Sequence, residues 1–287
     1  ATAFADGLTL SQYQELSAAL PERFRARFTP AGKLAVNWLE IRTPLEVGLY
    51  PMVVRTAHAV LAEGLSNVAI TPGQTTVEDL KWWYRQRLAQ LGLDTWFHPG
   101  VAIFRQGAAG ELGGDTVIRP GDMLWVDFGI SYLGLSTDTQ HLAYVLRPGE
   151  TDVPAGLKAG LAAANRAQDA VTSSFRTGIN GNDVLVAALR KAQAQGLKAT
   201  IYSHPIGTHG HAAGAAIGFW DDQKPSPRGD HPLRADTAWS IELNVVAPVP
   251  EWGGQEVPFR TEEDAFFDGR TVRYIDGRQT EFHLIRP

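Results

Sequence analysis

Four carboxylates and one imidazole occur in the chain at positions where they could bind metal ions together. In chain order they are Asp127, Asp138, His204, Glu242 and Glu263. All but one lie inside or beside short apolar runs that predict strands, and burying several carboxylates together costs many kcal/mol unless a cation or hydrogen bonds neutralise them. Two divalent cations held side by side would need such a donor set. The residues therefore predict a dinuclear metal site and, with it, an enzyme.

Two of the acids belong to one predicted β-hairpin. Its arms are residues 123–129 and 137–145, and they carry Asp127 and Asp138, which lie eleven positions apart. Two carboxylates within a few ångströms raise the pKa of one of them, and a bound divalent cation removes that penalty. Two surface aspartates near a turn are the alternative interpretation.

The other three donors each have an ordinary explanation when taken singly. His204 could be a hydrogen-bonded histidine at a strand end, Glu242 could face water, and Glu263 could belong to a solvated acidic turn. All five together, in strand contexts, favour metal binding instead. Beyond His204 the chain is rich in Gly and His, including His209 and His211, and such a segment lets a substrate approach the backbone.

Helices in the first half are expected to support these strands. Thr43 can cap a helix whose first turn accepts Pro44, and apolar residues at helical spacing continue to about Gly64. A second helix is expected to start at Thr76, with an acid three residues later, and to end near Gly92.

The second half repeats this order of elements. Glycine, capped helix, glycine, extended segment and His-Pro occur from Gly73 to His98 and again, about 105 residues later, from Gly178 to His204. In the second copy Asn182 is the expected cap, and an Ala-rich helix over about residues 154–175 joins the halves. The pattern predicts an α+β fold with a pseudo-twofold internal repeat, although low identity between the halves leaves chance as an alternative.

Composition bounds the remaining possibilities. The chain has 287 residues, a net charge of −5 and no cysteine, so disulfides, thiolate zinc sites and thiol nucleophiles are excluded. The sequence shows no basic patch for nucleic acid and no apolar stretch long enough for a membrane span, and both cytoplasm and periplasm fit. A start at Ala1 is expected to reflect processing or trimming. We expect a helical lead-in over residues 1–42, a catalytic domain over 43–287 and a long loop from Asp221 to Thr237.

The motifs together resemble one known family. Val126-Asp127-Phe128-Gly129, Thr137-Asp138, His204-Pro205-Ile206-Gly207 with His211, Ser240-Ile241-Glu242 and Glu263-Asp264 are similar to the motifs of the pita-bread metallopeptidases. That family contains prolidase, aminopeptidase P and methionine aminopeptidase, with creatinase as a non-metal relative. The resemblance covers about residues 43–270. It implies the pita-bread fold, a curved antiparallel sheet with helices on its outer face.

The resemblance also implies roles for individual residues. The metal ligands would be Asp127, Asp138, His204, Glu242 and Glu263, holding two divalent ions, usually Mn²⁺, with Co²⁺, Zn²⁺ and Fe²⁺ as alternatives. A water between the ions would give hydroxide near neutral pH, with Glu242 as general base and His211 stabilising the oxyanion. The implied reaction is hydrolysis of the N-terminal peptide bond of peptides, of Xaa-Pro type, and a homodimer is compatible with the family.

Two departures from the family pattern concern substrate binding. Relatives that recognise proline carry Arg two residues before the last metal glutamate, and counting from Glu263 that position is Thr261, with Arg260 one residue earlier. Relatives also carry a substrate-contacting histidine upstream of the first aspartate, for which His98 is the candidate. A catalytically inactive binding or scaffold member of the fold and a creatinase-like hydrolase of a small amide are the competing functions.

Overall fold

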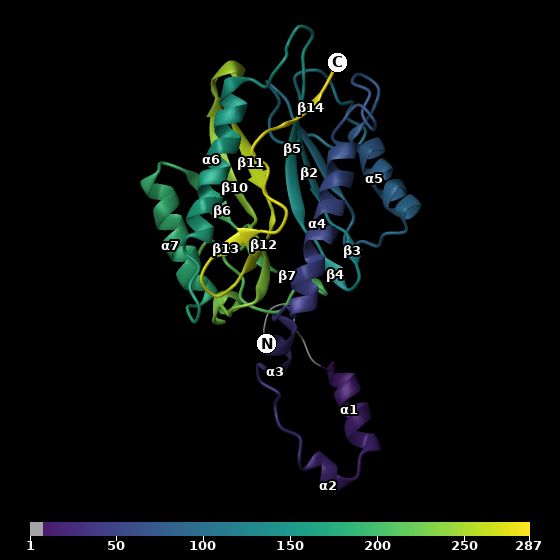
Figure 1. The fold of residues 1–287 in the computed structure, drawn as a ribbon, viewed down its shortest axis with the longest axis vertical. Coiled ribbons are helices and arrows are strands. Elements are labelled where there is room, and N and C mark those ends of the chain that lie inside the picture. The colour runs from purple at the N-terminus through teal and green to yellow at the C-terminus, as the bar shows by residue number, and fades with distance from the viewer. Residues whose placement is uncertain (1–7) are drawn as a thin grey trace.

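Long helices flank a central layer of strands in the computed structural model, which describes residues 8–287 (Figure 1). On one side lie α4 (Pro44–Gly64) and α5 (Val77–Leu91), and on the other lie α6 (Ala155–Thr172) and α7 (Gly181–Ala194). The shorter helices are α1 (Leu10–Ala19), α2 (Glu22–Arg25) and α3 (Leu34–Leu39), with 3-10 turns at Pro227–Gly229 and Pro250–Trp252.

The helix starts follow the expected capping chemistry, with one correction. The Thr43 hydroxyl accepts the Glu46 N–H while the Glu46 carboxylate accepts the Thr43 N–H at 2.7 Å, and Thr76 forms the same box at the start of α5. The cap of α7 is Asn180 and not Asn182. Asn182 instead hydrogen bonds in both directions to the backbone of Ser226, so its side chain fixes a loop.

Two antiparallel units of three strands form the middle of the molecule. The first has the order β1-β2-β5, which is β1 (Gly100–Phe104), β2 (Met123–Phe128) and β5 (Thr139–Val145). The second has the order β6-β10-β11, which is β6 (Lys198–Ile201), β10 (Leu243–Val249) and β11 (Gln255–Thr261). Two helices precede each unit, and its central strand comes second in the chain. This confirms the predicted α+β architecture with an internal repeat.

The remaining strands form a five-stranded sheet, a short hairpin and one strand added to the first unit. A five-stranded sheet has the order β13-β12-β9-β7-β8, and these strands are β7 (His204–Gly207), β8 (Gly210–His211), β9 (Thr237–Ser240), β12 (Asp264–Phe267) and β13 (Val272–Tyr274). A short hairpin, β3 (Ser131–Tyr132) with β4 (Leu135–Ser136), fills the turn of the predicted β2–β5 hairpin. The last strand, β14 (His283–Ile285), pairs in parallel with β5 and is the exception to the antiparallel pattern.

Strand alternation divides the core into two clusters. On β2, Leu124, Val126 and Phe128 pack into the cluster that includes α4 and α5, whereas Met123 and Trp125 pack against the cluster that includes α6 and α7. Side chains of successive strand residues point to opposite faces. Asp127 therefore shares a face with Trp125 and points away from α4 and α5.

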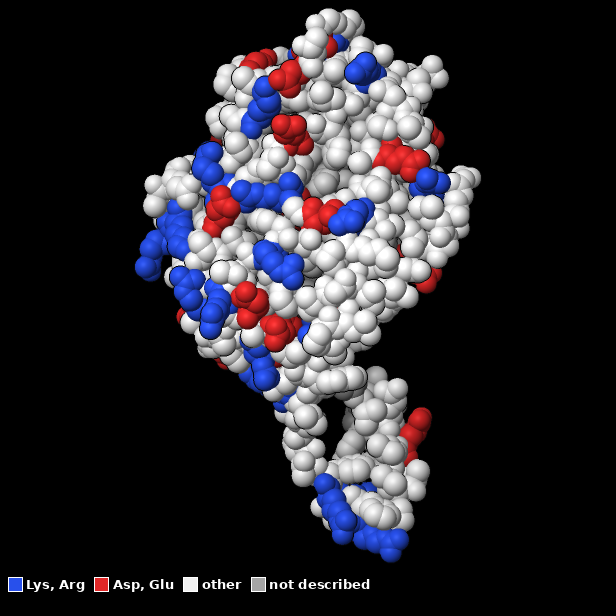
Figure 2. Space-filling view, in the orientation of Figure 1, with Lys and Arg blue, Asp and Glu red and all other residues white. Residues whose placement is uncertain are grey.

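The first three helices leave the body as an arm at the foot of the molecule (Figure 1). Helix α1 buries none of its side chains, and positive side chains gather at the tip of the arm, where α2 carries Arg23 and Arg25 (Figure 2). The described part of the expected lead-in, from residue 8, is thus largely helical, while the domain boundary at residue 42 stays a prediction. Within residues 8–287 we find no helix with the length and apolar character of a membrane span.

Candidate metal centre

Five donor side chains converge where several strands end. Asp127 lies in β2, Asp138 just before β5, His204 at the start of β7, and Glu242 between β9 and β10. The fifth is Glu262, between β11 and β12. Their donor atoms form overlapping groups within 4.8 Å, namely Asp127 with Asp138 and Glu262, His204 with Glu242 and Glu262, and Asp138 with His204 and His211.

Glu263, the predicted fifth ligand, does not belong to this cluster. Glu262 forms an isolated bridge with Gln140, and its side chain faces Asp127 and Asp138. Because consecutive residues in extended backbone point to opposite sides, Glu263 must face away, and its carboxylate contacts His58 and His141 instead. In the acidic run Glu262-Glu263-Asp264, the residue that faces the cluster is therefore one position before the predicted ligand.

His204 is oriented as a metal ligand would be. Its Nδ1 lies 3.1 Å from the carbonyl oxygen of Pro205, which fixes the ring. Its Nε2 faces three carboxylates, at 3.4 Å from Glu262 Oε1, 3.6 Å from Asp138 Oδ2 and 3.7 Å from Glu242 Oε2. This buried Nε2 has no hydrogen-bond partner within residues 8–287. Burial lowers the pKa of His204 to about 4, so the ring is neutral and its lone pair is available.

When no cation is bound, burial and mutual repulsion disfavour the charged forms of the carboxylates. Burial and mutual repulsion raise the pKa of Asp127, Asp138 and Glu242 well above the usual range, and burial raises that of Glu262 to about 7. In addition, Oδ1 of Asp127 is buried with no hydrogen-bond partner in the described part of the chain. A divalent cation would offset the repulsion and occupy the unpartnered oxygen, so the residues present fit a metal centre.

An amide not anticipated from the sequence joins two of the acids. Nε2 of Gln140 donates to Glu242 Oε1 at 2.8 Å and to Glu262 Oε2 at 2.6 Å, and the indole N–H of Trp125 donates to Gln140 Oε1 at 2.9 Å. The hydroxyl of Ser240 donates to Glu262 Oε1 at 2.5 Å. Gln140 lies two residues after Asp138, and residues two apart in extended backbone face the same side. The spacing therefore indicates that Gln140 lies beside the metal ligands.

His211 lies beside the cluster. Its ring packs edge-on against that of His204 with centroids 4.2 Å apart, and its Nε2 is 3.9 Å from Asp138 Oδ2. The ring of Trp96 covers it at 4.8 Å. Burial first, and then the neighbouring His204, lowers the pKa of His211 to about 3, so the imidazole is neutral.

A cavity of about 360 Å³ opens next to the donors. Its lining includes Asp127 and Glu242 from the cluster, the aromatic side chains Trp125, Tyr202 and Trp220, and Arg260. Counted from Glu262, the position two residues earlier is Arg260, so the departure at Thr261 disappears once the register is corrected.

His98 is placed differently from the other candidates. It is exposed just before β1, whose first residue, Gly100, pairs with Asp127. It is not among the residues that line the cavity. Its suggested contact with substrate stays a prediction.

Comparisons with known proteins agree with the fold. A family model described as metallopeptidase family M24 matches residues 53–272. None of the curated proteins compared with the chain matches it in sequence. Among solved structures, an X-Pro aminopeptidase from Thermotoga maritima is similar with a TM-score of 0.72 at 17% identity, covering 98% of this chain and 73% of the other. An Xaa-Pro dipeptidase from Bacillus anthracis has a TM-score of 0.68 at 21% identity, with 98% and 72% covered. A methionine aminopeptidase from Thermotoga maritima has 0.60 at 18%, with 84% and 100% covered.

Proposed function

The chain belongs to metallopeptidase family M24, and from that premise we propose that it is a dinuclear exopeptidase that hydrolyses the N-terminal peptide bond of Xaa-Pro peptides. Membership supports a metal-dependent hydrolase of peptides. The finer assignment is carried by one observation, the convergence of Asp127, Asp138, His204, Glu242 and Glu262 beside an aromatic cavity that contains Arg260.

The donor set divides naturally between two cations. Asp127 would bind one ion, His204 and Glu242 the other, and Asp138 and Glu262 lie in the groups that contain both kinds of partner. Two divalent ions there would lower the pKa of a shared water and so supply a nucleophile near neutral pH. Four carboxylates against one imidazole favour Mn²⁺, with Co²⁺, Zn²⁺ and Fe²⁺ as alternatives.

Glu242 and His211 are the side chains that can handle charge during the reaction. The Glu242 side chain is 21% exposed and lines the cavity, whereas those of Asp138 and Glu262 are 5% and 1% exposed. Glu242 is therefore better placed than Asp138 or Glu262 to take a proton from the attacking water. The neutral His211 would donate its ring N–H to the developing oxyanion, which is a stabilising interaction specific to the transition state.

The cavity supplies features suited to a short peptide. Trp125, Tyr202 and Trp220 offer flat apolar walls that fit the ring of a proline residue. Arg260 stacks over Trp125 at 4.9 Å, which presents its guanidinium at the cavity for a peptide carbonyl or carboxylate. The similar structures include proteins named X-Pro aminopeptidase and Xaa-Pro dipeptidase.

The two competing functions are less well supported. A scaffold protein does not need a full set of metal donors, and a creatinase-like hydrolase works without metal. Within residues 8–287, Nε2 of His204 and Oδ1 of Asp127 have no hydrogen-bond partner, which favours metal-dependent catalysis over both.

Adjacent glutamates provide the test. The chain is freed of metal, reloaded with Mn²⁺, and assayed on dipeptides that differ only in having proline or alanine second. We expect Glu262→Gln to lose about 100-fold or more in kcat/KM together with metal, since it removes a charged ligand. The matched variant Glu263→Gln, which leaves the cluster's donors in place, should retain bound Mn²⁺. Full activity of Glu262→Gln or of the metal-free chain would overturn the proposal, as would activity on guanidino compounds without peptide cleavage.

A further inference from the structure

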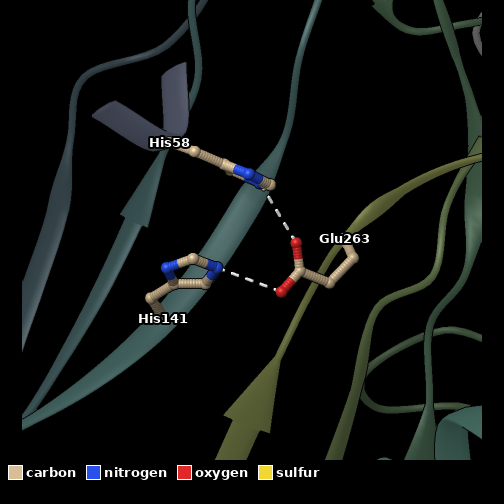
Figure 3. Close-up of side chains that lie close together, drawn as sticks. All are labelled: His58, His141 and Glu263. Atoms are coloured by element: carbon tan, nitrogen blue, oxygen red, sulfur yellow. Dashed lines mark hydrogen bonds and ion pairs between the residues drawn. The ribbon is translucent and has the colours of Figure 1, made fainter. Parts of the chain in front are cut away.

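A second cluster of donor atoms lies behind the first, on the side of α4. His58 from α4 and His141 from β5 point at the two oxygens of Glu263 (Figure 3). Nε2 of His58 is 3.2 Å from Oε2 of Glu263, and Nε2 of His141 is 3.0 Å from Oε1. All three donor groups lie within 4.8 Å of one another.

Alternation along the strands separates this cluster from the proposed catalytic one. Gln140 and His141 are neighbours on β5, yet the first contacts Glu242 and Glu262 while the second contacts Glu263. Likewise, Glu262 faces the first cluster and Glu263 faces the second. The two clusters are therefore on opposite faces of one layer of backbone, and none of the three side chains in the second is needed to complete the first.

Each histidine is held from behind by a further polar side chain. Nδ1 of His58 is 3.1 Å from Oδ2 of Asp276, and Nδ1 of His141 is 3.1 Å from Nε2 of His283. Both rings are thereby turned so that Nε2 faces Glu263. Metal-binding histidines in proteins have this outer partner on the nitrogen that does not bind, because it fixes the orientation and tautomer.

Two of the donor atoms interact only with each other. Nε2 of His58 and Oε2 of Glu263 are buried and form an ion pair at 3.2 Å, and neither has a further hydrogen-bond partner within the described residues. The Glu263 side chain is only 1% exposed, so water cannot satisfy its oxygen from outside. A cation that displaces the proton shared by this ion pair would bind both atoms and leave neither without a partner.

From this arrangement we propose that His58, His141 and Glu263 form a separate mononuclear site for a transition-metal ion of the Zn²⁺ class. Two imidazoles and one carboxylate are the donor set of mononuclear zinc sites, and tetrahedral Zn²⁺ with bonds of about 2.0–2.1 Å places its donors roughly 3.3–3.5 Å apart. The observed separations of 3.2 and 3.0 Å are slightly shorter than that spacing, so a bound ion would move the donors apart by a few tenths of an ångström. The His58 side chain, 16% exposed, gives the ion a route from solvent.

Metal counting tests this site independently of peptidase activity. Metal-free wild type is equilibrated with Zn²⁺, desalted and analysed for zinc per chain, and His58→Gln is treated in parallel because glutamine keeps an amide donor near Nε2. We expect the variant to bind about one ion fewer than wild type. His231→Gln is the matched control, since His231 is a buried histidine that contacts the single carboxylate of Glu40 at 3.0 Å without a second imidazole.

Several results would overturn the proposal. One is equal zinc content in wild type and His58→Gln, and another is no more than two ions per chain in wild type when His204 and its neighbours are loaded. His141→Gln removes a donor from a different element and guards against a folding defect in the first variant, and circular dichroism confirms the fold of each. Adding Zn²⁺ to Mn²⁺-loaded wild type needs no substitution and should show an additional bound ion. Because the readout is a difference in metal content, it can fail while the proposed peptidase activity succeeds, and the reverse.

Discussion

Replacing Gln140 by methionine should weaken the proposed catalytic metal centre without removing any of its ligands. The amide of Gln140 donates to both Glu242 and Glu262, and no other side chain among residues 8–287 donates a hydrogen bond to both. Methionine has a similar volume but no N–H. The substitution therefore frees the two carboxylates to turn and leaves the indole N–H of Trp125 without its acceptor.

The expected loss can be estimated from these contacts. Hydrogen bonds to charged groups contribute about 1.5–3 kcal/mol each, but part of this is recovered as water and the cation compete for the same oxygens. Partners of metal ligands typically change metal affinity or activity by about 10–100-fold when mutated, which corresponds to about 1.4–2.7 kcal/mol. We expect a loss of that size in Mn²⁺ affinity and a comparable loss in kcat/KM.

The assay is a chelator competition for Mn²⁺ followed by kinetics at saturating metal. Gln168→Met is the matched control, because Gln168 is a buried glutamine on α6 whose Nε2 donates to the backbone oxygen of Ile241 and touches no donor of the cluster. A folded Gln140→Met variant with the Mn²⁺ affinity and kcat/KM of wild type would show that the amide has no positioning role.

Two further outcomes follow from the cluster and from the core. At one hundred times its Kd, Mn²⁺ should add about 2.7 kcal/mol to the stability of wild type and so raise its thermal midpoint. The midpoint of Glu262→Gln should change much less. Equal shifts of the two midpoints in calorimetry would count against the site. Gly160→Ala should destabilise the chain by about 1–3 kcal/mol because a Cβ there overlaps the ring of Phe259. Gly48→Ala, a helical glycine with open space around it, should instead stabilise it by about 0.5–1 kcal/mol, and similar denaturation midpoints for both variants would contradict the packing argument.

Local chemistry allowed much of the fold to be predicted from the sequence. Thr43 and Thr76 each have an acid three residues later, so their helix starts follow from short-range hydrogen bonding alone. The cap at Asn180 was missed because Asn182 is chemically equivalent and lies two residues away. The parallel pairing of β14 with β5 has no local signal, since it joins residues about 140 positions apart.

The metal ligands, like the helix starts, could be predicted where the local sequence alone identifies them. Asp127, Asp138, His204 and Glu242 come together as expected, because each is the only acid or imidazole within two residues of its own position. Glu262 and Glu263 are identical side chains in one acidic run, and only the strand register decides which faces which cluster. Gln140 carries no charge, so the sequence did not indicate that it lies between two glutamates.

The pairing of β14 beside β5 has a consequence for how the chain is made. A ribosome releases Asp138 long before Glu262, and it releases His283 and its neighbours later still, yet β5 needs all of them before its surroundings are complete. Long-range pairings of this kind form slowly, and a half-made sheet exposes unpaired edges. The nascent chain is therefore expected to be prone to aggregation at this edge of β5 until residues 283–285 have been synthesised and paired.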